Sequence, residues 1–446
     1  MTNKKQFAGK LSRGIGTMLT LTLFAGLAAS AHAAEKVIHD FANSDGATSE
    51  SDVIFDAAGN LYGVTTAGGD LSCRSGQGCG TVFKLSKTSA GWRRTVLYKF
   101  KGGNDGEFPL GRLVLDKAGN LYGTTFVGGA GVGGVVYELS PTSTGGWNFA
   151  VLHSFGNVTA EGQNLTAGLI MDAAGNLYGT AQAAGASLSS CFGSGCGVVF
   201  ELSPTSGGGW TETVIYSFLG IGDGGAPYGG VIFDGAGNLY GTTTEGGNLS
   251  GCGGGGCGVV YKLSPTSSGG WIETVLHAFS GGSDGSRAFG SVVFDASGNL
   301  YGTTQDGGNL KGCNGFGCGL VYKLSPNTHG GWTETAIHDF QPGPGGDGGY
   351  KGAHPTAGLV LDVSGALYGA TPVGGSSRSG VVFKLSNSTG TWRETLLHTF
   401  SGTLGSGPDG AFPSAGVTFD GSGNLFGTTS YGGSTPFAGT VFEITP

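Results

Sequence analysis

The feature that most constrains the fold is one short motif, Asp-x-x-Gly-Asn-Leu-Tyr-Gly-Thr, which returns along the whole chain with little change. Successive copies are separated by 56 to 67 residues. A period of this length is typical of repeat architectures, in which each unit packs against its neighbours. The aspartate of the motif occurs at Asp56, Asp116, Asp172, Asp234, Asp295, Asp362 and Asp420.

Each unit contains four runs with the composition of β-strands. In the fourth unit these runs are GGVIFD (229–234), NLYGTT (238–243), GVVYKLS (258–264) and WIETVLHAF (271–279). They are rich in Val, Ile, Tyr, Phe and Thr and are bounded by Gly, Ser, Pro or Asp. Between the first two runs, Asp-x-x-Gly-Asn fits a type I turn followed by a left-handed glycine. The repeated motif is therefore predicted to form the turn and to have no role in catalysis or binding.

The order of the strands at the two ends of the chain predicts how the repeats close. A tryptophan-free copy of the fourth strand, VIHDF (37–41), stands near the start, and the chain ends on a third strand, GTVFEITP (439–446). An N-terminal strand that completes the last unit is typical of a closed ring, which leaves no large exposed sheet edge. We therefore predict an all-β, seven-bladed β-propeller with four antiparallel strands per blade, the N-terminal strand closing the last blade. A β-helix of wide coils is the alternative. The other six fourth strands begin at Trp92, Trp147, Trp210, Trp271, Trp332 and Trp392.

The string GNLYGTT…GG…GxVFKLSP also resembles the GloVer-type tandem-repeat proteins of bacteria, over essentially all of residues 35–446. The resemblance implies an exported protein with a propeller-like fold. It implies no established activity and no catalytic residues.

The first 33 residues have the features of a secretory signal peptide, with a basic start, a short apolar core and an Ala-His-Ala site. Residues 34–446 then form a single domain. Without the signal the formal net charge moves from −8 to −12, because the segment holds four cationic and no anionic residues. An acidic chain without a Lys/Arg cluster argues against nucleic acid as a partner. We expect an exported monomer, secreted or periplasmic, with no membrane insertion.

The eight cysteines form four close pairs in the loops between second and third strands of units one, three, four and five. Other units have shorter loops there and lack both cysteines, so the pairs are predicted to be local disulfides. Zinc is the alternative, but the pairs lack Cys-x2-Cys spacing. The predicted pairs are Cys73 with Cys79, Cys191 with Cys196, Cys252 with Cys257, and Cys313 with Cys318.

Two further series recur with the blades. A His or Tyr of each fourth strand is predicted to pack beside the Phe two residues later; these are His39, Tyr98, His153, Tyr216, His277, His338 and His398. An acidic residue followed by glycine precedes each first strand, at Asp45, Asp105, Glu161, Asp223, Asp284, Asp347 and Asp409. We expect these carboxylates around one mouth of the central channel, as turn residues. Binding of Ca²⁺ or a polyol at one or two blades is the alternative reading.

A binding surface is predicted on the face that carries the cysteine loops, because rigid loops with aromatic tips are common recognition elements. Its candidate residues are Phe192, Glu245, Asp306, Lys311, Asn314, Phe316 and His354. The sequence contains no Gly-x-Ser-x-Gly elbow, His-Glu-x-x-His helix or phosphate loop. The first functional hypothesis is thus an exported scaffold that binds a glycan or a surface protein and has no assigned catalytic residue or obligatory cofactor. The alternative is a metal-assisted lyase or hydrolase at the channel mouth, which rests on fold analogy.

Overall fold

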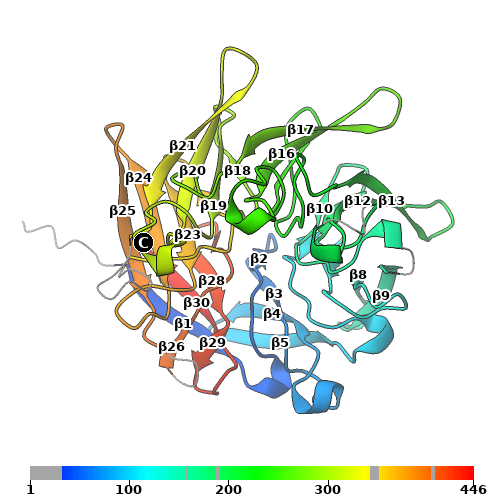
Figure 1. Cartoon of the computed structure of the whole chain (residues 1–446). Coiled ribbons are helices and arrows are strands. Elements are labelled where there is room, and N and C mark those ends of the chain that lie inside the picture. Colours follow the sequence, from blue (N-terminus) through cyan, green and yellow to red (C-terminus); the bar gives the residue numbers. More distant parts are fainter. Residues whose placement is uncertain (1–32, 157–158, 187–190, 342–350, 403–406) are drawn as a thin grey trace, which may run out of the picture. The chain divides into compact units, whose positions relative to one another are not determined.

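The computed structural model describes residues 33–156, 159–186, 191–341, 351–402 and 407–446, and the predicted signal peptide lies outside this range except for Ala33. Residues Ala33–Pro446 form one compact unit. Within the described residues, seven four-stranded antiparallel sheets follow one another around a ring (Figure 1). The predicted seven-bladed propeller is therefore confirmed.

Each blade has a two-residue inner strand, a second strand of four or five residues and two longer outer strands. Blades 1 to 3 are β2(Ile54–Phe55) β3(Leu61–Thr65) β4(Thr81–Thr88) β5(Gly91–Lys99), β6(Val114–Leu115) β7(Leu121–Thr124) β8(Val135–Pro141) β9(Trp147–Ser154), and β10(Ile170–Met171) β11(Leu177–Ala181) β12(Val198–Pro204) β13(Trp210–Ser217). Blades 4 to 6 are β14(Ile232–Phe233) β15(Leu239–Thr242) β16(Val259–Pro265) β17(Trp271–Ala278), β18(Val293–Phe294) β19(Leu300–Thr304) β20(Leu320–Pro326) β21(Trp332–Asp339), and β22(Val360–Leu361) β23(Leu367–Thr371) β24(Val381–Asn387) β25(Trp392–Thr399).

Blade 7 joins the two ends of the chain. It consists of β27(Thr418–Phe419), β28(Leu425–Thr429), β30(Thr440–Thr445) and the N-terminal β1(Ala34–Asp40). Strand β1 pairs antiparallel with β30, so the N-terminal strand closes the last blade as predicted. A two-stranded sheet of β26(Gly407–Ala411) and β29(Tyr431–Gly433) stands beside this blade and was not expected from the sequence.

The helical elements in the described residues are short 3₁₀ turns. They are η1(Asn43–Asp45), η2(Cys73–Gly76), η3(Gly103–Asp105), η4(Thr159–Glu161), η5(Cys191–Gly193), η6(Cys252–Gly254) and η7(Cys313–Gly315). Within the described part of the chain, no helix has the length and apolar character needed to cross a membrane.

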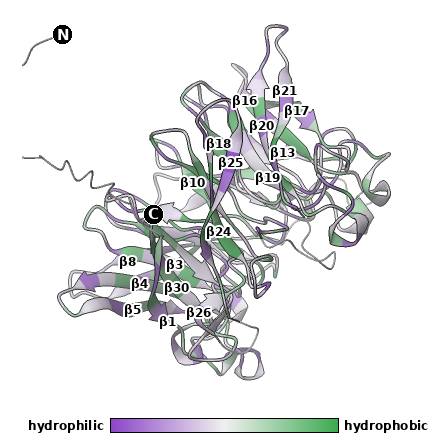
Figure 2. Ribbon diagram, turned by 90° about the vertical axis from the view of Figure 1, so that its left-hand side faces the viewer, coloured by the Kyte–Doolittle hydropathy of each residue, from purple (hydrophilic) through white to green (hydrophobic). Residues whose placement is uncertain are grey.

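The hydrophobic core lies between neighbouring blades rather than at one centre. Each apolar cluster combines side chains of two adjacent blades, as where Phe100 of blade 1 packs with Tyr137 of blade 2. Figure 2 shows the hydrophobic residues concentrated along the strands. Because each blade buries its faces against two neighbours, closure of the ring by β1 completes the core.

The repeated motif has a structural explanation at every polar position. In blade 4, Asp234 Oδ1 accepts hydrogen bonds from the backbone nitrogens of Ala236 and Asn238, both at 2.9 Å. Its Oδ2 accepts from the Tyr240 hydroxyl at 3.1 Å. Gly237 has a φ of +83°, the left-handed conformation that the turn requires. The motif therefore builds the turn, in agreement with the sequence-based interpretation.

The Gly-Thr end of the motif connects blades. A Cβ atom on Gly241 would lie 2.4 Å from the buried hydroxyl of Tyr261, so no larger residue fits beneath that ring. The next residue, Thr242, donates its hydroxyl to the carbonyl oxygen of Gly290 in blade 5 at 3.0 Å. This hydrogen bond links the inner parts of two blades and so helps to shape the central channel.

Candidate functional site

Seven residues at equivalent places, one per blade, adopt the left-handed conformation without being glycine; we call this the mouth position. Their φ angles run from 51° at Ala226 to 63° at Asn164. A non-glycine residue in this conformation costs about 1 kcal/mol or more, so the surrounding structure must hold it there. The seven are Thr48, Phe108, Asn164, Ala226, Arg287, His354 and Phe412.

The backbone at the mouth position is fixed from both sides. In blade 5, the nitrogen of Arg287 donates to the carbonyl oxygen of Cys257 at 2.8 Å, and the carbonyl oxygen of Arg287 accepts from the nitrogen of Gln305 at 3.0 Å. Because main-chain atoms make these bonds, the side chain is free to vary. Seven blades thus present Thr, Phe, Asn, Ala, Arg, His and Phe at one geometrically equivalent place.

The chain passes from the mouth position into a central cavity of about 610 Å³ lined by all seven blades. This volume is within the range of small-molecule binding sites. The residue two places after each mouth position lines the cavity, and we call this set the rim. The rim residues are Glu50, Leu110, Thr166, Tyr228, Phe289, Thr356 and Ser414.

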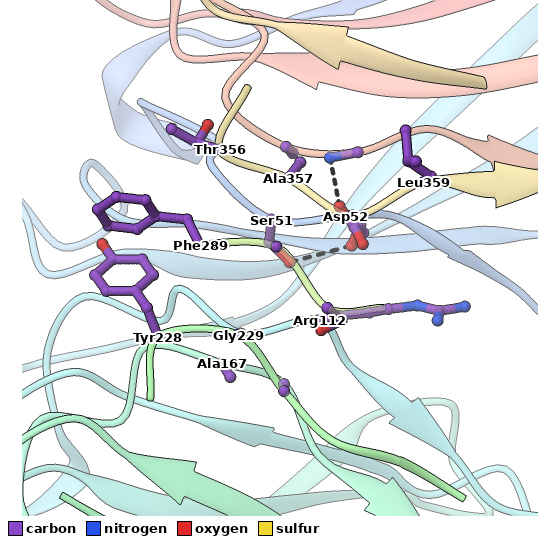
Figure 3. Close-up of a pocket in the computed structure, with 18 of the residues that line it drawn as sticks. Ser51, Asp52, Arg112, Ala167, Tyr228, Gly229, Phe289, Thr356, Ala357 and Leu359 are labelled. Carbon is purple, nitrogen blue, oxygen red and sulfur yellow. Dashed lines mark hydrogen bonds between the residues drawn. The ribbon is translucent and has the colours of Figure 1, made fainter. Parts of the chain in front are cut away.

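The cavity wall differs from one side to the other (Figure 3). Blades 4 and 5 contribute Tyr228 and Phe289, whose rings meet edge to face with centroids 4.8 Å apart. Blade 1 contributes Glu50 and Asp52. Desolvation by the cavity walls raises the pKa of the Glu50 carboxyl. The pKa of Tyr228 is raised mainly by burial and to a smaller extent by the charge of Glu50. One side of the cavity is therefore aromatic and another is acidic.

Deeper in the cavity, one position of the repeat carries a charged residue in two blades, where most blades carry glycine. In blade 1 this residue is Asp52, whose Oδ1 atom accepts a hydrogen bond from the backbone nitrogen of Gly416 at 2.6 Å, which joins blades 1 and 7. In blade 2 it is Arg112, and its guanidinium extends away from Tyr228 and Phe289 (Figure 3).

Two of the predicted binding residues meet at the mouth between blades 5 and 6. Asp306 Oδ1 lies 3.2 Å from His354 Nδ1, and Asp306 Oδ2 accepts a hydrogen bond from Arg287 Nε at 2.6 Å. His354 Nδ1 also lies 3.0 Å from the carbonyl oxygen of Gln305. The Asp306 side chain is only 7% exposed, whereas Arg287 and His354 are more open to solvent. Arg287 was not predicted from the sequence, although it stands at the position that His354 occupies one blade later.

The other predicted binding residues lie apart from this cluster. Glu245 occupies the place of Asp306 in blade 4, where Ala226 stands instead of Arg287, and burial raises the pKa of its carboxyl. Lys311, Asn314 and Phe316 are exposed on the loop around η7, and Phe316 is 67% exposed. The side chain of Phe192 falls outside the described residues.

All four predicted disulfides are present, with Cα–Cα distances of 5.2 to 5.8 Å. The structure therefore confirms the pairing in every cysteine loop, and the alternative of zinc at these loops is wrong because their thiols are consumed. Cys73 is bonded to Cys79, Cys191 to Cys196, Cys252 to Cys257 and Cys313 to Cys318.

The disulfides support the mouth position. The carbonyl oxygen of the second cysteine of each pair accepts a hydrogen bond from the backbone nitrogen of the mouth residue in the following blade. Cys196 accepts from Ala226 at 2.9 Å, and Cys318 accepts from His354 at 2.8 Å. The disulfide loops of blades 3, 4 and 5 therefore brace the mouth of blades 4, 5 and 6.

The predicted placement of the acidic series around the channel mouth is wrong. The described members instead contact the His or Tyr on the outer strand that precedes them in the chain, and none of them lines the central cavity. Asp105 and Asp223 accept hydrogen bonds from Tyr98 and Tyr216 at 2.6 and 3.0 Å. The turn that precedes each first strand folds back over the outer strand, which brings the carboxylate there. Asp347 lies outside the described residues. Calcium binding by this series stays a prediction.

The predicted packing of the outer-strand His or Tyr beside a phenylalanine is confirmed. Ring centroids lie 4.6 Å apart for His153 and Phe155 and 4.8 Å apart for His277 and Phe279, in edge-to-face geometry. These rings are part of the wall between blades.

Among solved structures, the one similarity with a TM-score above 0.5 that we report shows the fold alone. An ancestral GH74 enzyme is 13% identical with a TM-score of 0.58, over 90% of this chain and 48% of that enzyme, so this chain spans about half its length. A protein from Lactobacillus plantarum is 14% identical (TM-score 0.47, 82% of this chain, 95% of that one). A putative 6-phosphogluconolactonase from Bacteroides fragilis is 13% identical (TM-score 0.46, 82% and 94%).

A search among curated proteins finds no significant match. The family comparison is informative, because the sequence profile of the Gloeobacter/Verrucomicrobia repeat matches residues 9–192 and 188–410. These matches cover most of the chain and include most of the blades described above. The protein therefore belongs to the Gloeobacter/Verrucomicrobia repeat family, in agreement with the resemblance carried by its GNLYGTT motifs.

Proposed function

We propose that the protein is an exported glycan-binding propeller, which holds the end of a glycan chain at the mouth of the central cavity. The observation that carries this proposal is the pairing of an aromatic wall, Tyr228 and Phe289, with the polar cluster of Arg287, Asp306 and His354 in neighbouring blades. Concave sites that combine aromatic surface with a few fixed polar groups are typical of small-ligand recognition.

The chemistry of a sugar suits this arrangement. Its C–H face is apolar and packs on an aromatic ring, whereas its hydroxyl groups need donors and acceptors held in place. Tyr228 and Phe289 provide the aromatic surface. The half-exposed Arg287 and His354 provide polar groups for the hydroxyls. Because Asp306 holds both side chains and the disulfide loops hold their backbones, little conformational entropy would be lost on binding.

A surface protein as the ligand is the competing form of the same hypothesis. Such a partner would use the exposed loop tips, of which Phe316 is the most open described aromatic residue, rather than the cavity. The two forms therefore predict different sensitive residues.

The test is a glycan array followed by calorimetry with the purified protein and three single variants. Tyr228→Ala and Phe289→Ala should each weaken binding of the selected glycan at least about tenfold, which is 1.4 kcal/mol. Phe316→Ala should leave the affinity unchanged. Binding that survives both cavity variants but is lost in Phe316→Ala would place the ligand on the loops and contradict the proposal. The thermal midpoint of each variant checks that the fold is retained.

A second candidate, a hydrolase or lyase, is favoured by the contact between Asp306 and His354. If the Nδ1–H of His354 donates to the carboxylate, Nε2 is left as the proton acceptor, the arrangement of a general base. The test is turnover of the bound glycan. His354→Asn should abolish turnover, whereas binding should weaken without being lost, because Tyr228, Phe289 and Arg287 still contact the sugar. Loss of turnover in chelator would indicate metal assistance. A bound glycan that stays intact over long incubation would leave binding alone.

A further inference from the structure

The outer edges of neighbouring blades meet in a recurring set of three residues, which we call a junction. Each junction combines the outer-strand His or Tyr of one blade, the acidic residue of the turn that follows it, and an outer-strand residue of the next blade. The third residue stands two places after the tryptophan position. The sets with all three members described are His39/Asp45/Arg94, Tyr98/Asp105/Phe149, His153/Glu161/Glu212, Tyr216/Asp223/Glu273, His277/Asp284/Glu334 and His398/Asp409/Glu35.

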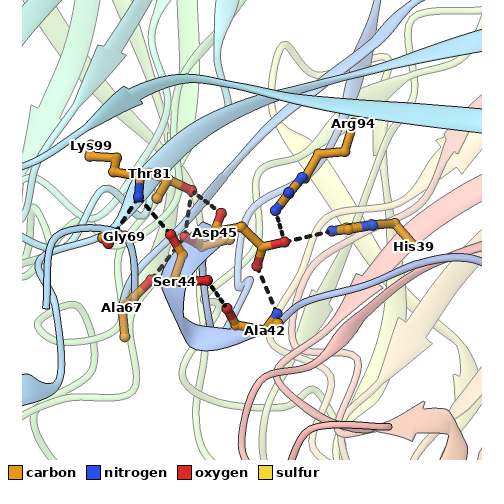
Figure 4. Close-up of polar contacts among 10 residues, drawn as sticks. His39, Ala42, Ser44, Asp45, Ala67, Gly69, Thr81, Arg94 and Lys99 are labelled. Atoms are coloured by element: carbon orange, nitrogen blue, oxygen red, sulfur yellow. Dashed lines mark hydrogen bonds and ion pairs between the residues drawn. The ribbon is translucent and has the colours of Figure 1, made fainter.

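At two junctions the chain supplies its own positive charge. Between blades 7 and 1, Arg94 is ion-paired with Asp45, and His39 approaches the same carboxylate (Figure 4). Between blades 5 and 6, Lys351 Nζ lies 3.6 Å from Glu394 Oε2. Both cations lie at the place where the two blades and the turn converge. The junction is therefore a place where a cation is accommodated.

At a third junction, an aromatic residue stands where other junctions have a charged one. Between blades 1 and 2, Phe149 takes the third place and stacks on Tyr98 with ring centroids 4.1 Å apart. Only one carboxylate, that of Asp105, remains there, and it is hydrogen-bonded to the Tyr98 hydroxyl.

The junction between blades 2 and 3 has two carboxylates and a histidine in close contact. His153 Nε2 lies 3.4 Å from Glu161 Oε2. One ligand atom from each of His153, Glu161 and Glu212 falls within 4.8 Å of the other two. In the described part of the chain, His153 Nε2 and Glu212 Oε1 are buried atoms without a hydrogen-bond partner. Both unpaired atoms are of the kind that coordinates a metal, a neutral imidazole nitrogen and a carboxylate oxygen.

We propose that this junction is a zinc-binding site, with His153 Nε2 and the carboxylates of Glu161 and Glu212 as its protein ligands. Zinc binds nitrogen and carboxylate oxygen at about 2.0–2.2 Å, and ligand atoms of a tetrahedral site then lie about 3.4 Å apart. The separation of 3.4 Å between His153 and Glu161 matches this value. The ion would take the place that Arg94 takes between blades 7 and 1, and would clamp blade 2 to blade 3.

Zinc suits the donor set better than calcium does. Calcium takes six to eight oxygen ligands, whereas this junction offers a nitrogen and two carboxylates. The fourth position would be filled by water.

The test uses the purified full chain, stripped with EDTA and titrated with ZnCl₂ at pH 7.5 by calorimetry and by thermal unfolding. We expect saturable binding and a higher thermal midpoint. Glu212→Gln should weaken the affinity at least about tenfold, since it removes one anionic ligand without changing the shape. The matched control is Glu273→Gln, at the same place one junction later, where Tyr216 replaces the histidine; zinc binding should be unchanged.

His153→Tyr provides a second variant that is compatible with the fold, because tyrosine occupies this place at two other junctions. It should also abolish the site while retaining the thermal midpoint of the stripped protein within a few degrees. The absence of zinc binding in the wild type, or binding that is equal in Glu212→Gln and wild type, would overturn the proposal. An equal loss in Glu273→Gln would do the same, because the effect would then be one of general surface charge.

Discussion

The backbone carbonyl oxygen of Cys257 accepts a hydrogen bond from the backbone nitrogen of Arg287 at 2.8 Å. Cys257 belongs to the disulfide loop of blade 4, and Arg287 is the mouth residue of blade 5. The covalent ring is therefore one hydrogen bond away from a side chain of the candidate binding site. This relationship links a reinforcement that is local in sequence to a site that several blades build together.

Removing this disulfide should affect both stability and binding. For the double variant Cys252→Ser with Cys257→Ser, we expect the free energy of unfolding to fall by about 2 kcal/mol, the loop-entropy value for so short a ring. Glycan affinity should fall several-fold because Arg287 loses its fixed backbone partner. Chemical denaturation and calorimetry measure the two effects.

The control is the double variant Cys73→Ser with Cys79→Ser. It opens a ring of similar size, but Cys79 supports Phe108 of blade 2 rather than a residue of the aromatic and polar cluster. Stability should fall to a similar extent with no change in glycan affinity. Equal losses of affinity in the two double variants would contradict the link between the blade 4 loop and the site.

Asp306 and Glu245 occupy equivalent places but should respond differently to substitution. Asp306→Ala removes the acceptor of the Arg287 hydrogen bond and the partner of His354, and we expect a loss of about 1–2 kcal/mol in the free energy of unfolding. The half-exposed Arg287 can regain water, which keeps the loss at this level. Glu245→Ala should cause no loss at pH 7, since burial disfavours its charged form. Denaturant unfolding of both variants checks the contrast.

Glu394 should make the protein less stable as the pH rises. Its side chain is 1% exposed, and burial raises the pKa of its carboxyl to about 7, only partly offset by Lys351. The folded state then holds a proton that the unfolded state releases above about pH 4.5, so this contribution is fully present at lower pH and is lost as the pH rises through 7. Among the described residues, His338 also faces this carboxyl. Burial, followed by the charge of Lys351, lowers the pKa of His338 to about 4, which contributes in the opposite direction below pH 6.5.

The variant Glu394→Gln isolates this effect, because glutamine keeps the shape of the neutral carboxyl. The difference in thermal midpoint, variant minus wild type, should increase between pH 5 and about pH 7 and then level off, in buffer with EDTA. A difference that stays constant across this range would show that Glu394 ionises in the folded protein as it does in the unfolded chain.

Much of the architecture could be predicted from the sequence because it is local and repeated. The Asp-x-x-Gly-Asn turn of Asp234 depends on atoms within six residues, so each copy indicates the same hairpin. The disulfide of Cys313 and Cys318 closes over five residues, and pairs that are present or absent together leave little choice of partner. The order of the strands at the two ends of the sequence predicted that the N-terminal strand, which contains His39, completes the last blade beside the C-terminal strand.

The site itself depended on the angle between blades, which no single repeat encodes. Asp306 and His354 are separated by 48 residues and meet only because blades 5 and 6 are neighbours in the ring. The acidic series was placed at the channel mouth on topology, but the turn that contains Asp223 folds back over the outer strand and brings the carboxylate to Tyr216 instead.

The sequence by itself thus determined the number of blades, their closure and their covalent reinforcement, since these follow from short-range turn chemistry repeated at a fixed period. Only the tertiary structure decided which side chains of different blades share a cavity or a junction. Tyr228 and Phe289 meet in the central cavity, and His153 and Glu212 meet at a junction. The physical reason is that these contacts are set by the packing of large buried rings between blades, such as Tyr261 against Phe218, which fixes the distance and angle at which one repeat meets the next.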